Sequence, residues 1–198
     1  MPDLLWVDLE TTGLNATLFW SRILEASFVL TDERGTILKS FTKIPTFQRR
    51  HLDYIVRDLP PKVREMHTKS GLIDELFEVS FSAAPINKLY EDNDRYESQL
   101  REGMIAVAQT LQHKLPMSGA SVHFDRRWLA KFAPEIESGF HYRDFDISTI
   151  RMSVKFLRPD LAKSEPEKRG IHRTLADIED AIRYYRWAQE NFFVKQEG

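Results

Sequence analysis

The sequence predicts a layered fold of the α/β or α+β type, because strands come first and helices mixed with further strands follow. Three runs at residues 4–10, 23–30 and 36–44 are apolar or alternating and end at turn-like clusters, which predicts an antiparallel meander. Residues 174–192 carry apolar side chains at helical spacing, which predicts a long amphipathic helix. That helix presents Leu175, Ile178, Ile182, Tyr185 and Phe192 on one stripe.

In the middle of the chain, predicted helices alternate with short predicted strands. Helical spacing is expected over residues 60–66, 71–81, 94–115, 125–132 and 148–157, and short strands over 118–122 and 145–147. Ser148 is the expected N-cap of the helix that follows it, and residues 158–170 form a solvated loop. No linker is long enough to divide the chain, so we expect one domain over residues 1–198.

The amino-acid composition and net charge exclude several classes of protein. The 198 residues are 42% hydrophobic and include no cysteine, which excludes a disulfide scaffold, a thiol nucleophile and a cysteine-ligated metal site. The formal charge is −2, so the chain lacks the excess of basic residues that is typical of proteins that bind long nucleic acids. The N-terminal segment does not resemble a signal peptide, and no window approaches the roughly 20 apolar residues of a membrane span. We expect a cytoplasmic protein without a membrane partner.

Two acids occur where a buried strand ends. Side chains two residues apart share one face of a strand, so Trp6, Asp8 and Glu10 project together while their neighbours pack on the other side. Two adjacent carboxylates repel each other, and a bridging cation relieves that cost. Mg²⁺ suits such oxygen ligands. The alternative is a pair of ordinary strand-end acids that cap neighbouring turns.

Three further residues could complete a site. Asp125 opens a predicted helix, where an acid is most often an N-cap. His172 and Asp177 are five residues apart and do not share one ideal helical face, so His172 is expected on the loop before the last helix and Asp177 within that helix. The alternative for His172 is a surface or capping residue.

Three sequence motifs that contain these acids and His172 resemble, in their order along the chain, those of a known superfamily. Asp8-Leu9-Glu10-Thr11-Thr12-Gly13-Leu14, His123-Phe124-Asp125-Arg126-Arg127-Trp128-Leu129 and His172-Arg173-Thr174-Leu175-Ala176-Asp177 resemble the three exonuclease motifs of the DEDDh superfamily. Within it, residues 67–72, 125–129, 140–143, 146–150 and 183–186 are most similar to the oligoribonuclease family. The resemblance extends from Leu5 to about Phe193. It implies an α/β, RNase H-like mixed sheet flanked by helices.

The resemblance also implies an activity. Asp8, Glu10, Asp125 and Asp177 would bind two divalent metal ions, Mg²⁺ or Mn²⁺, and His172 would be the general base. Two metals can clamp the attacking and leaving oxygens of a phosphoryl displacement. The expected protein is a homodimeric 3′→5′ exoribonuclease that degrades short oligoribonucleotides, especially dinucleotides, to nucleoside 5′-monophosphates.

The substrate-binding residues follow from the same resemblance. Ser121, Arg143 and Ser148 would cap the 5′ phosphate of a dinucleotide, with His67 and Tyr142 nearby, and the partner subunit would donate Tyr142 and Arg143. Leu14 would wedge between the two bases. Without the resemblance, Leu14 reads as a core residue, Arg143 as part of a surface salt bridge and Ser148 as a helix cap.

The chain departs from the family pattern at two places that keep other functions open. No tryptophan precedes His67 to stack on a base, and Phe19 and Trp20 are candidates to replace it. Thr11 matches proofreading relatives, which favours a 3′→5′ DNA exonuclease as the alternative. A nucleotide-binding module without turnover is the third hypothesis. Glu25, in an apolar strand, is expected to be a structural hydrogen-bonding acid.

Overall fold

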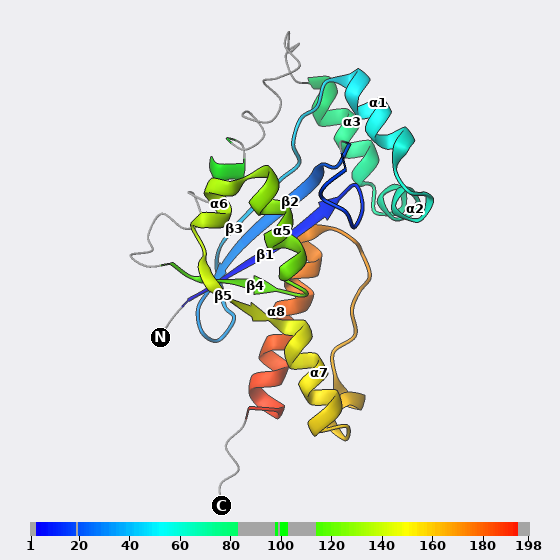
Figure 1. The fold of residues 1–198 in the computed structure, drawn as a ribbon. Coiled ribbons are helices and arrows are strands. Elements are labelled where there is room, and N and C mark those ends of the chain that lie inside the picture. The colour runs from blue at the N-terminus through cyan, green and yellow to red at the C-terminus, as the bar shows by residue number, and fades with distance from the viewer. Residues whose placement is uncertain (1–2, 19, 83–97, 99, 103–113, 194–198) are drawn as a thin grey trace, which may run out of the picture.

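A five-stranded mixed sheet forms the centre of the molecule (Figure 1). The computed structural model describes residues 3–18, 20–82, 98, 100–102 and 114–193. The strand order is β3-β2-β1-β4-β5; β1 pairs antiparallel with β2 and parallel with β4, β2 is antiparallel to β3, and β4 is parallel to β5. The predicted antiparallel meander is therefore confirmed. The strands are β1 Leu4–Thr11, β2 Ile23–Thr31, β3 Ile37–Lys43, β4 Pro116–Gly119 and β5 His141–Asp146.

Helices cover both faces of this sheet (Figure 1). On one face, Leu5, Val7 and Leu9 pack with the residues of α5 (His123–Phe132) and α6 (Pro134–Ser138). On the other, Trp6 packs with α7 (Ile147–Leu157) and α8 (Thr174–Asn191). The predicted division of the first strand into two faces is confirmed, and so is the predicted C-terminal helix, whose buried stripe includes Ile178.

Three further helices lie near the start of β2. They are α1 Arg49–Asp58, α2 Pro61–Lys69 and α3 Leu72–Ser82. Leu24 of β2 packs in one apolar cluster with Leu52 and Ile55 of α1 and with Leu72 and Leu76 of α3. This cluster fixes α1 and α3 against the sheet, close to the carboxyl end of β1 (Figure 1). The sequence patterns predicted α2 and α3 but not α1.

Several predicted boundaries need correction. The helix expected over residues 94–115 lies mostly outside the described residues, and its end is wrong because Lys114 and Leu115 are not helical. The strand expected at 118–122 occupies Pro116–Gly119, since Ser121 has a φ of +62° that turns the chain toward α5. The strand expected at 145–147 starts at His141. A 3₁₀ helix, η1 (Leu161–Ser164), forms within the predicted loop.

The N-cap of α7 is also different from the expectation. Asp146 occupies the cap position with an extended backbone, and its carboxylate accepts a hydrogen bond from the backbone nitrogen of Ser148 at 2.7 Å. A carboxylate so placed satisfies one of the free amide groups of the first helical turn. Ser148 therefore lies inside the helix, and its hydroxyl is available for another partner. Among the described residues, no helix is long and apolar enough to cross a bilayer.

Candidate active site

The carboxyl end of β1 supplies two acids to the candidate site. β1 lies between β2 and β4 and helices cover both faces of the sheet, so the side chains of β1 are mostly buried. Glu10 is 7% exposed, and Asp8, two residues earlier, projects from the same face of the strand. The close approach of β4 requires a glycine, because a Cβ on Gly119 would lie 2.7 Å from the carbonyl oxygen of Val7. This contact fixes the strand residue that directly precedes Asp8.

The start of α8 brings two more functional groups to the same place. Asp177 is in the first turn of the helix, and His172 lies on the loop before it with a φ of +55°, a conformation rare for residues other than glycine. One side-chain oxygen each of Glu10 and Asp177 and one ring nitrogen of His172 lie within 4.8 Å of one another. His172 is exposed, and the N-cap of α8 is Arg173, so His172 does not act as a helix cap.

Asp125 approaches from the other side of β1. It is 3% exposed and lies in the first turn of α5, whose N-cap is Val122. The alternative that Asp125 caps this helix is therefore wrong. The backbone amide of Leu9, between the two strand acids, acts to lower the pKa of the Asp125 carboxyl, against the larger effect of burial. The carboxyl ends of the parallel strands β1 and β4 thus bring Asp125 next to the acids of β1.

Burial and mutual repulsion make these carboxyl groups hard to ionise. Burial raises the pKa of Asp8 well above its ordinary value, and repulsion from Asp125, Glu10 and Asp177 adds to the shift. Burial, with repulsion from Asp177 and Glu25, raises the pKa of Glu10 to about 8. Burial also raises the pKa values of Asp125 and Asp177. A divalent cation bound among these oxygens would relieve the repulsion, so the donor set fits a hard metal ion.

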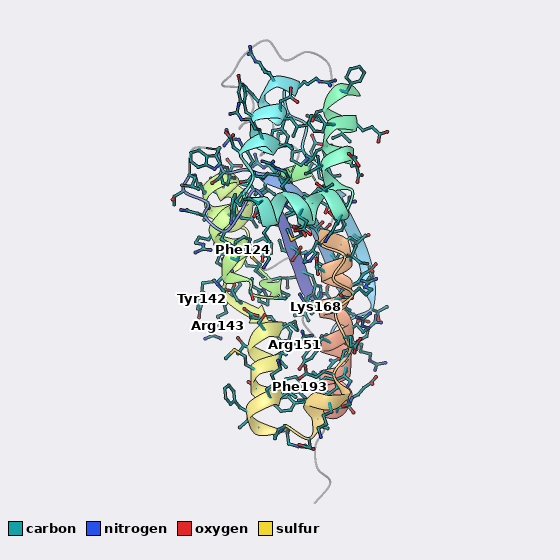
Figure 2. All side chains as sticks on the ribbon, turned by 90° about the vertical axis from the view of Figure 1, so that its right-hand side faces the viewer. Phe124, Tyr142, Arg143, Arg151, Lys168 and Phe193 are labelled. Carbon is teal, nitrogen blue, oxygen red and sulfur yellow. The ribbon has the colours of Figure 1, made fainter. Side chains whose placement is uncertain are left out.

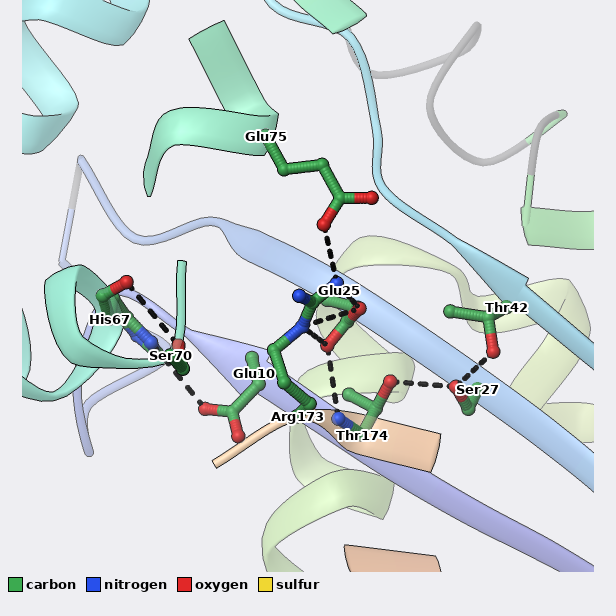
Figure 3. Close-up of polar contacts among 9 residues, drawn as sticks. All are labelled: Glu10, Glu25, Ser27, Thr42, His67, Ser70, Glu75, Arg173 and Thr174. Carbon is green, nitrogen blue, oxygen red and sulfur yellow. Dashed lines mark hydrogen bonds and ion pairs between the residues drawn. The ribbon is translucent and has the colours of Figure 1, made fainter. Parts of the chain in front are cut away.

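A network of ion pairs holds the His172 loop in place (Figure 3). The Arg173 guanidinium donates to both carboxylate oxygens of Glu25, with Nη2 at 2.7 Å from Oε1, and to Glu75 of α3 at 2.7 Å. The backbone nitrogen of Thr174 also donates to Glu25 at 3.0 Å. Glu25 lies opposite Glu10 in the β1–β2 pairing. The expectation that Glu25 is a structural acid agrees with these bonds.

His67 of α2 lies beneath the end of β1 (Figure 3). Its ring is fully buried, and Nε2 lies 2.9 Å from the carbonyl oxygen of Thr11, so Nε2 is the protonated nitrogen. Nδ1 faces the Glu10 carboxylate at 3.7 Å and has no hydrogen-bond partner among the described residues. Burial lowers the pKa of this imidazole. The buried ring therefore holds the end of β1 from inside the protein.

Ser121 and Ser148 meet at the start of α7. Asp146 accepts hydrogen bonds from the backbone nitrogens of Ser121 at 3.0 Å and Val122 at 3.2 Å, as well as from Ser148. The two serine hydroxyl oxygens consequently lie 3.0 Å apart. They line a cavity of about 240 Å³, together with Arg151 and Lys168. These two cations were not among the residues expected from the sequence, although the three-residue spacing of Ser148 and Arg151 places both on the same face of one helix.

The comparisons with known proteins agree with this geometry. The oligoribonuclease of Chromobacterium violaceum is 33% identical over 190 residues, which cover 96% of this chain and 95% of that protein. The oligoribonuclease of Streptomyces griseus is 33% identical over 195 residues, which cover 98% of this chain and 89% of that protein. The chain belongs to the oligoribonuclease family. No family model matches the sequence.

Solved structures show the same fold at much lower sequence identity. The metal-free E. coli exonuclease I–ssDNA complex superposes with a TM-score of 0.64 at 14% identity and covers 97% of this chain. Exonuclease I from Methylocaldum szegediense superposes with a TM-score of 0.59 at 18% identity and covers 96% of this chain. The chain spans about 40% of the length of these exonuclease chains. The expected α/β, RNase H-like mixed sheet is confirmed by these neighbours and by the strand order.

The remaining residues of this chain that the sequence predicted to bind substrate lie at the surface. Tyr142 is 77% exposed and stacks on His141, and the Arg143 guanidinium lies 5.3 Å from the Tyr142 ring centre. Both project from β5, away from α8 (Figure 2). Leu14 is 82% exposed, so the alternative that it is a core residue is wrong. Trp20 is 47% exposed, and Phe19 lies outside the described residues.

Proposed function

We propose that this chain is a divalent-metal-dependent 3′→5′ exoribonuclease that hydrolyses short oligoribonucleotides, above all dinucleotides, to nucleoside 5′-monophosphates. The observation that carries the proposal is the meeting of Glu10, His172 and Asp177 within 4.8 Å, beside Asp8 and Asp125, at the carboxyl end of the central strand β1. The oligoribonuclease names of the relatives support the choice of substrate. A chain without cysteine suits the reducing cytoplasm, where we propose that it acts.

Asp8, Glu10, Asp125 and Asp177 are the proposed ligands of two Mg²⁺ or Mn²⁺ ions. Their donor atoms are carboxylate oxygens, which hard divalent cations prefer. Buried carboxyl groups with raised pKa values lose their protons when a cation binds, so metal binding and deprotonation are coupled. When bound, the two ions would polarise the scissile phosphodiester and favour deprotonation of the attacking water.

His172 is the proposed general base. Its ring is open to solvent, lies beside the carboxylates and can accept a proton from a water molecule near Glu10 and Asp177. The loop that carries it has a backbone conformation that favours glycine, so neighbouring contacts must hold it. Arg173 and Thr174 supply these contacts through Glu25, which lies on the adjacent strand.

We propose substrate-binding roles for residues that are exposed, half-buried or, in the case of His67, fully buried. Leu14 presents an apolar side chain beside the first motif, where it can insert between two bases. Ser121 and Ser148 offer hydroxyl groups to the 5′ phosphate, with His67 holding the strand end nearby. We propose that a homodimer places Tyr142 and Arg143 of one subunit at the site of its partner. Exposed apolar side chains on α7 support such an interface; they are Met152, Phe156 and Leu157.

The test is a time course with Mn²⁺ on three 5′-labelled substrates: a diribonucleotide, an RNA 20-mer and a DNA 20-mer. We expect fast cleavage of the diribonucleotide, slow trimming of the RNA 20-mer and no activity when EDTA is present. An intact diribonucleotide in the presence of folded protein and Mn²⁺ would overturn the proposal. A preference for the DNA 20-mer would favour the proofreading type of exonuclease instead.

A further inference from the structure

Lys168 is a cation beside the carboxylates that the proposed mechanism does not use. It lies on the connection before α8, and its ammonium nitrogen is 3.9 Å from Asp177 Oδ1. Among the described residues, Asp177 is the acid with which Lys168 forms an ion pair. The neighbouring Arg173, in contrast, is engaged by Glu25 and Glu75. Figure 2 shows Lys168 beside α8, so a lysine charge lies at the edge of the carboxylate cluster.

The charge of Lys168 acts on most of this cluster. Burial raises the pKa values of Asp8, Glu10 and Asp177, and the charge of Lys168 opposes the shift at each of them. The lysine side chain is 49% exposed. A lysine ammonium group is a compact charge on a flexible four-carbon stem. The group can therefore leave Asp177 for a ligand close by while the backbone stays in place.

Residues of α8 hold the backbone on both sides of Lys168. The carbonyl oxygen of Glu167 accepts a hydrogen bond from the Arg183 guanidinium. Arg169 donates its backbone nitrogen and its Nε to the buried Asp180 carboxylate, at 2.8 and 2.7 Å. These bonds fix the start of the lysine side chain beside the site, while its half-exposed end can move.

Charge balance indicates what this lysine does in the metal-bound enzyme. Four ionised carboxylates balance two divalent cations, so the negative charge of a phosphodiester has no partner among these groups. Carboxylate oxygens that coordinate cations also attract Lys168 less strongly. We propose that the Lys168 ammonium group then binds an oxygen of the scissile phosphodiester, as a further catalytic residue; this inference rests on the proposed function. A lysine so placed stabilises the charge that develops on the phosphoryl oxygens during the reaction.

The first measurement is the affinity for Mn²⁺, which does not depend on turnover. Calorimetry follows the titration of Mn²⁺ into the wild type, Lys168→Gln, Lys168→Arg and Lys163→Gln, after EDTA treatment and dialysis. Lys163 is an exposed lysine of η1 on the same connection, so Lys163→Gln is the matched control. Since Mn²⁺ must displace the half-exposed lysine from Asp177, Lys168→Gln should bind Mn²⁺ about 1.5- to 5-fold more tightly. Lys168→Arg keeps the charge and should match the wild type.

The second measurement is cleavage of a diribonucleotide by the same variants at saturating Mn²⁺. Loss of a charge-assisted hydrogen bond to the phosphodiester predicts that Lys168→Gln lowers kcat/KM about 10- to 100-fold. Lys168→Arg should recover part of the loss, since it restores the charge with a different shape. Lys168→Gln thus combines tighter metal binding with slower cleavage. A lysine that only supported the fold would weaken both when it is replaced.

Three outcomes would overturn the role of Lys168 and leave the proposed function standing. Tighter Mn²⁺ binding with unchanged cleavage would show that the lysine is only a counter-ion of Asp177. Weaker Mn²⁺ binding with slower cleavage would show that it supports the metal ligands instead of the substrate. No difference between Lys168→Gln and Lys163→Gln in either measurement is the third. Failure of the wild type to cleave the diribonucleotide would overturn the proposed function, and this inference with it.

Discussion

Replacing Arg173 by methionine should destabilise the protein strongly, because it leaves a buried carboxylate without its main partner. The Glu25 side chain is 2% exposed and accepts three hydrogen bonds from Arg173, from Nε at 3.1 Å to each oxygen and from Nη2 at 2.7 Å. In the variant, one bond from the backbone of Thr174 remains. Methionine keeps the length and apolar stem of the side chain and removes its charge.

The expected loss of folding free energy follows from the burial of the Glu25 carboxylate. Removing one partner of a buried ion pair costs about 3–5 kcal/mol, because the other charge stays in a poorly solvated place. The Arg173 side chain is 25% exposed, so water can reach part of the vacated space, and we expect the lower end, about 3 kcal/mol. For a chain of this length, that loss lowers the melting temperature by roughly 6–12 °C. The contribution of Glu75 is small, since its side chain is 43% exposed.

Urea denaturation in EDTA, followed by tryptophan fluorescence, measures this loss. Arg158→Gln is the matched control, because Arg158 pairs with Asp160 at 2.7 Å on the exposed surface and should cost at most about 1 kcal/mol. Adding Glu25→Gln to Arg173→Met should recover at least about 1 kcal/mol, since a neutral amide is cheaper to bury than an unpaired carboxylate. An Arg173→Met cost under about 1 kcal/mol, or strictly additive effects in the double variant, would refute the reasoning.

Three further predictions concern the acids and the exposed leucine. The Glu10 carboxyl keeps its proton up to about pH 8 in the folded state but loses it near its ordinary pKa of 4.5 when unfolded, so the metal-free protein should lose stability as pH rises from about 4.5 to 8. Melting temperatures in EDTA test this, and a rise with pH over that range would contradict it. Asp8→Ala should weaken Mn²⁺ binding in calorimetry, whereas His172→Ala should retain it and lose about 10²–10⁴-fold in kcat; equal losses of metal affinity would contradict the assigned roles. Leu14→Ala should change stability by less than about 0.5 kcal/mol and raise KM for the diribonucleotide, and a large loss of stability would show that the side chain is packed.

The sequence predicted those elements whose periodicity is strong. The first three strands and the C-terminal helix carry apolar side chains at clear spacing, and the structure has them within one or two residues of the expected limits. Helix α1 was missed although Leu52, Ile55 and Val56 recur at helical spacing along it. Its position depends on packing against Leu24 of β2, a contact that local patterns do not contain.

The site could be predicted as a set of residues but not as an arrangement. The motifs indicated which acids and which histidine to consider, but their proximity depends on the parallel β1–β4 pairing and on how α8 starts. Asp146 replaced Ser148 as the helix cap because its carboxylate also binds the turn before α5, a contact between segments about 25 residues apart. The placement of Arg151 and Lys168 in one cavity likewise requires α7 and the loop before α8 to be folded together.

The most direct test of the central claim is a competition experiment in one tube. A 5′-phosphorylated diribonucleotide and an RNA 20-mer, at equal concentrations and with Mn²⁺, compete for the same enzyme, so the ratio of their initial rates gives the ratio of kcat/KM values. We predict a ratio well above tenfold in favour of the diribonucleotide, with both reactions stopped by EDTA. Equal rates, or faster loss of the 20-mer, would contradict the assignment of this chain to short RNA.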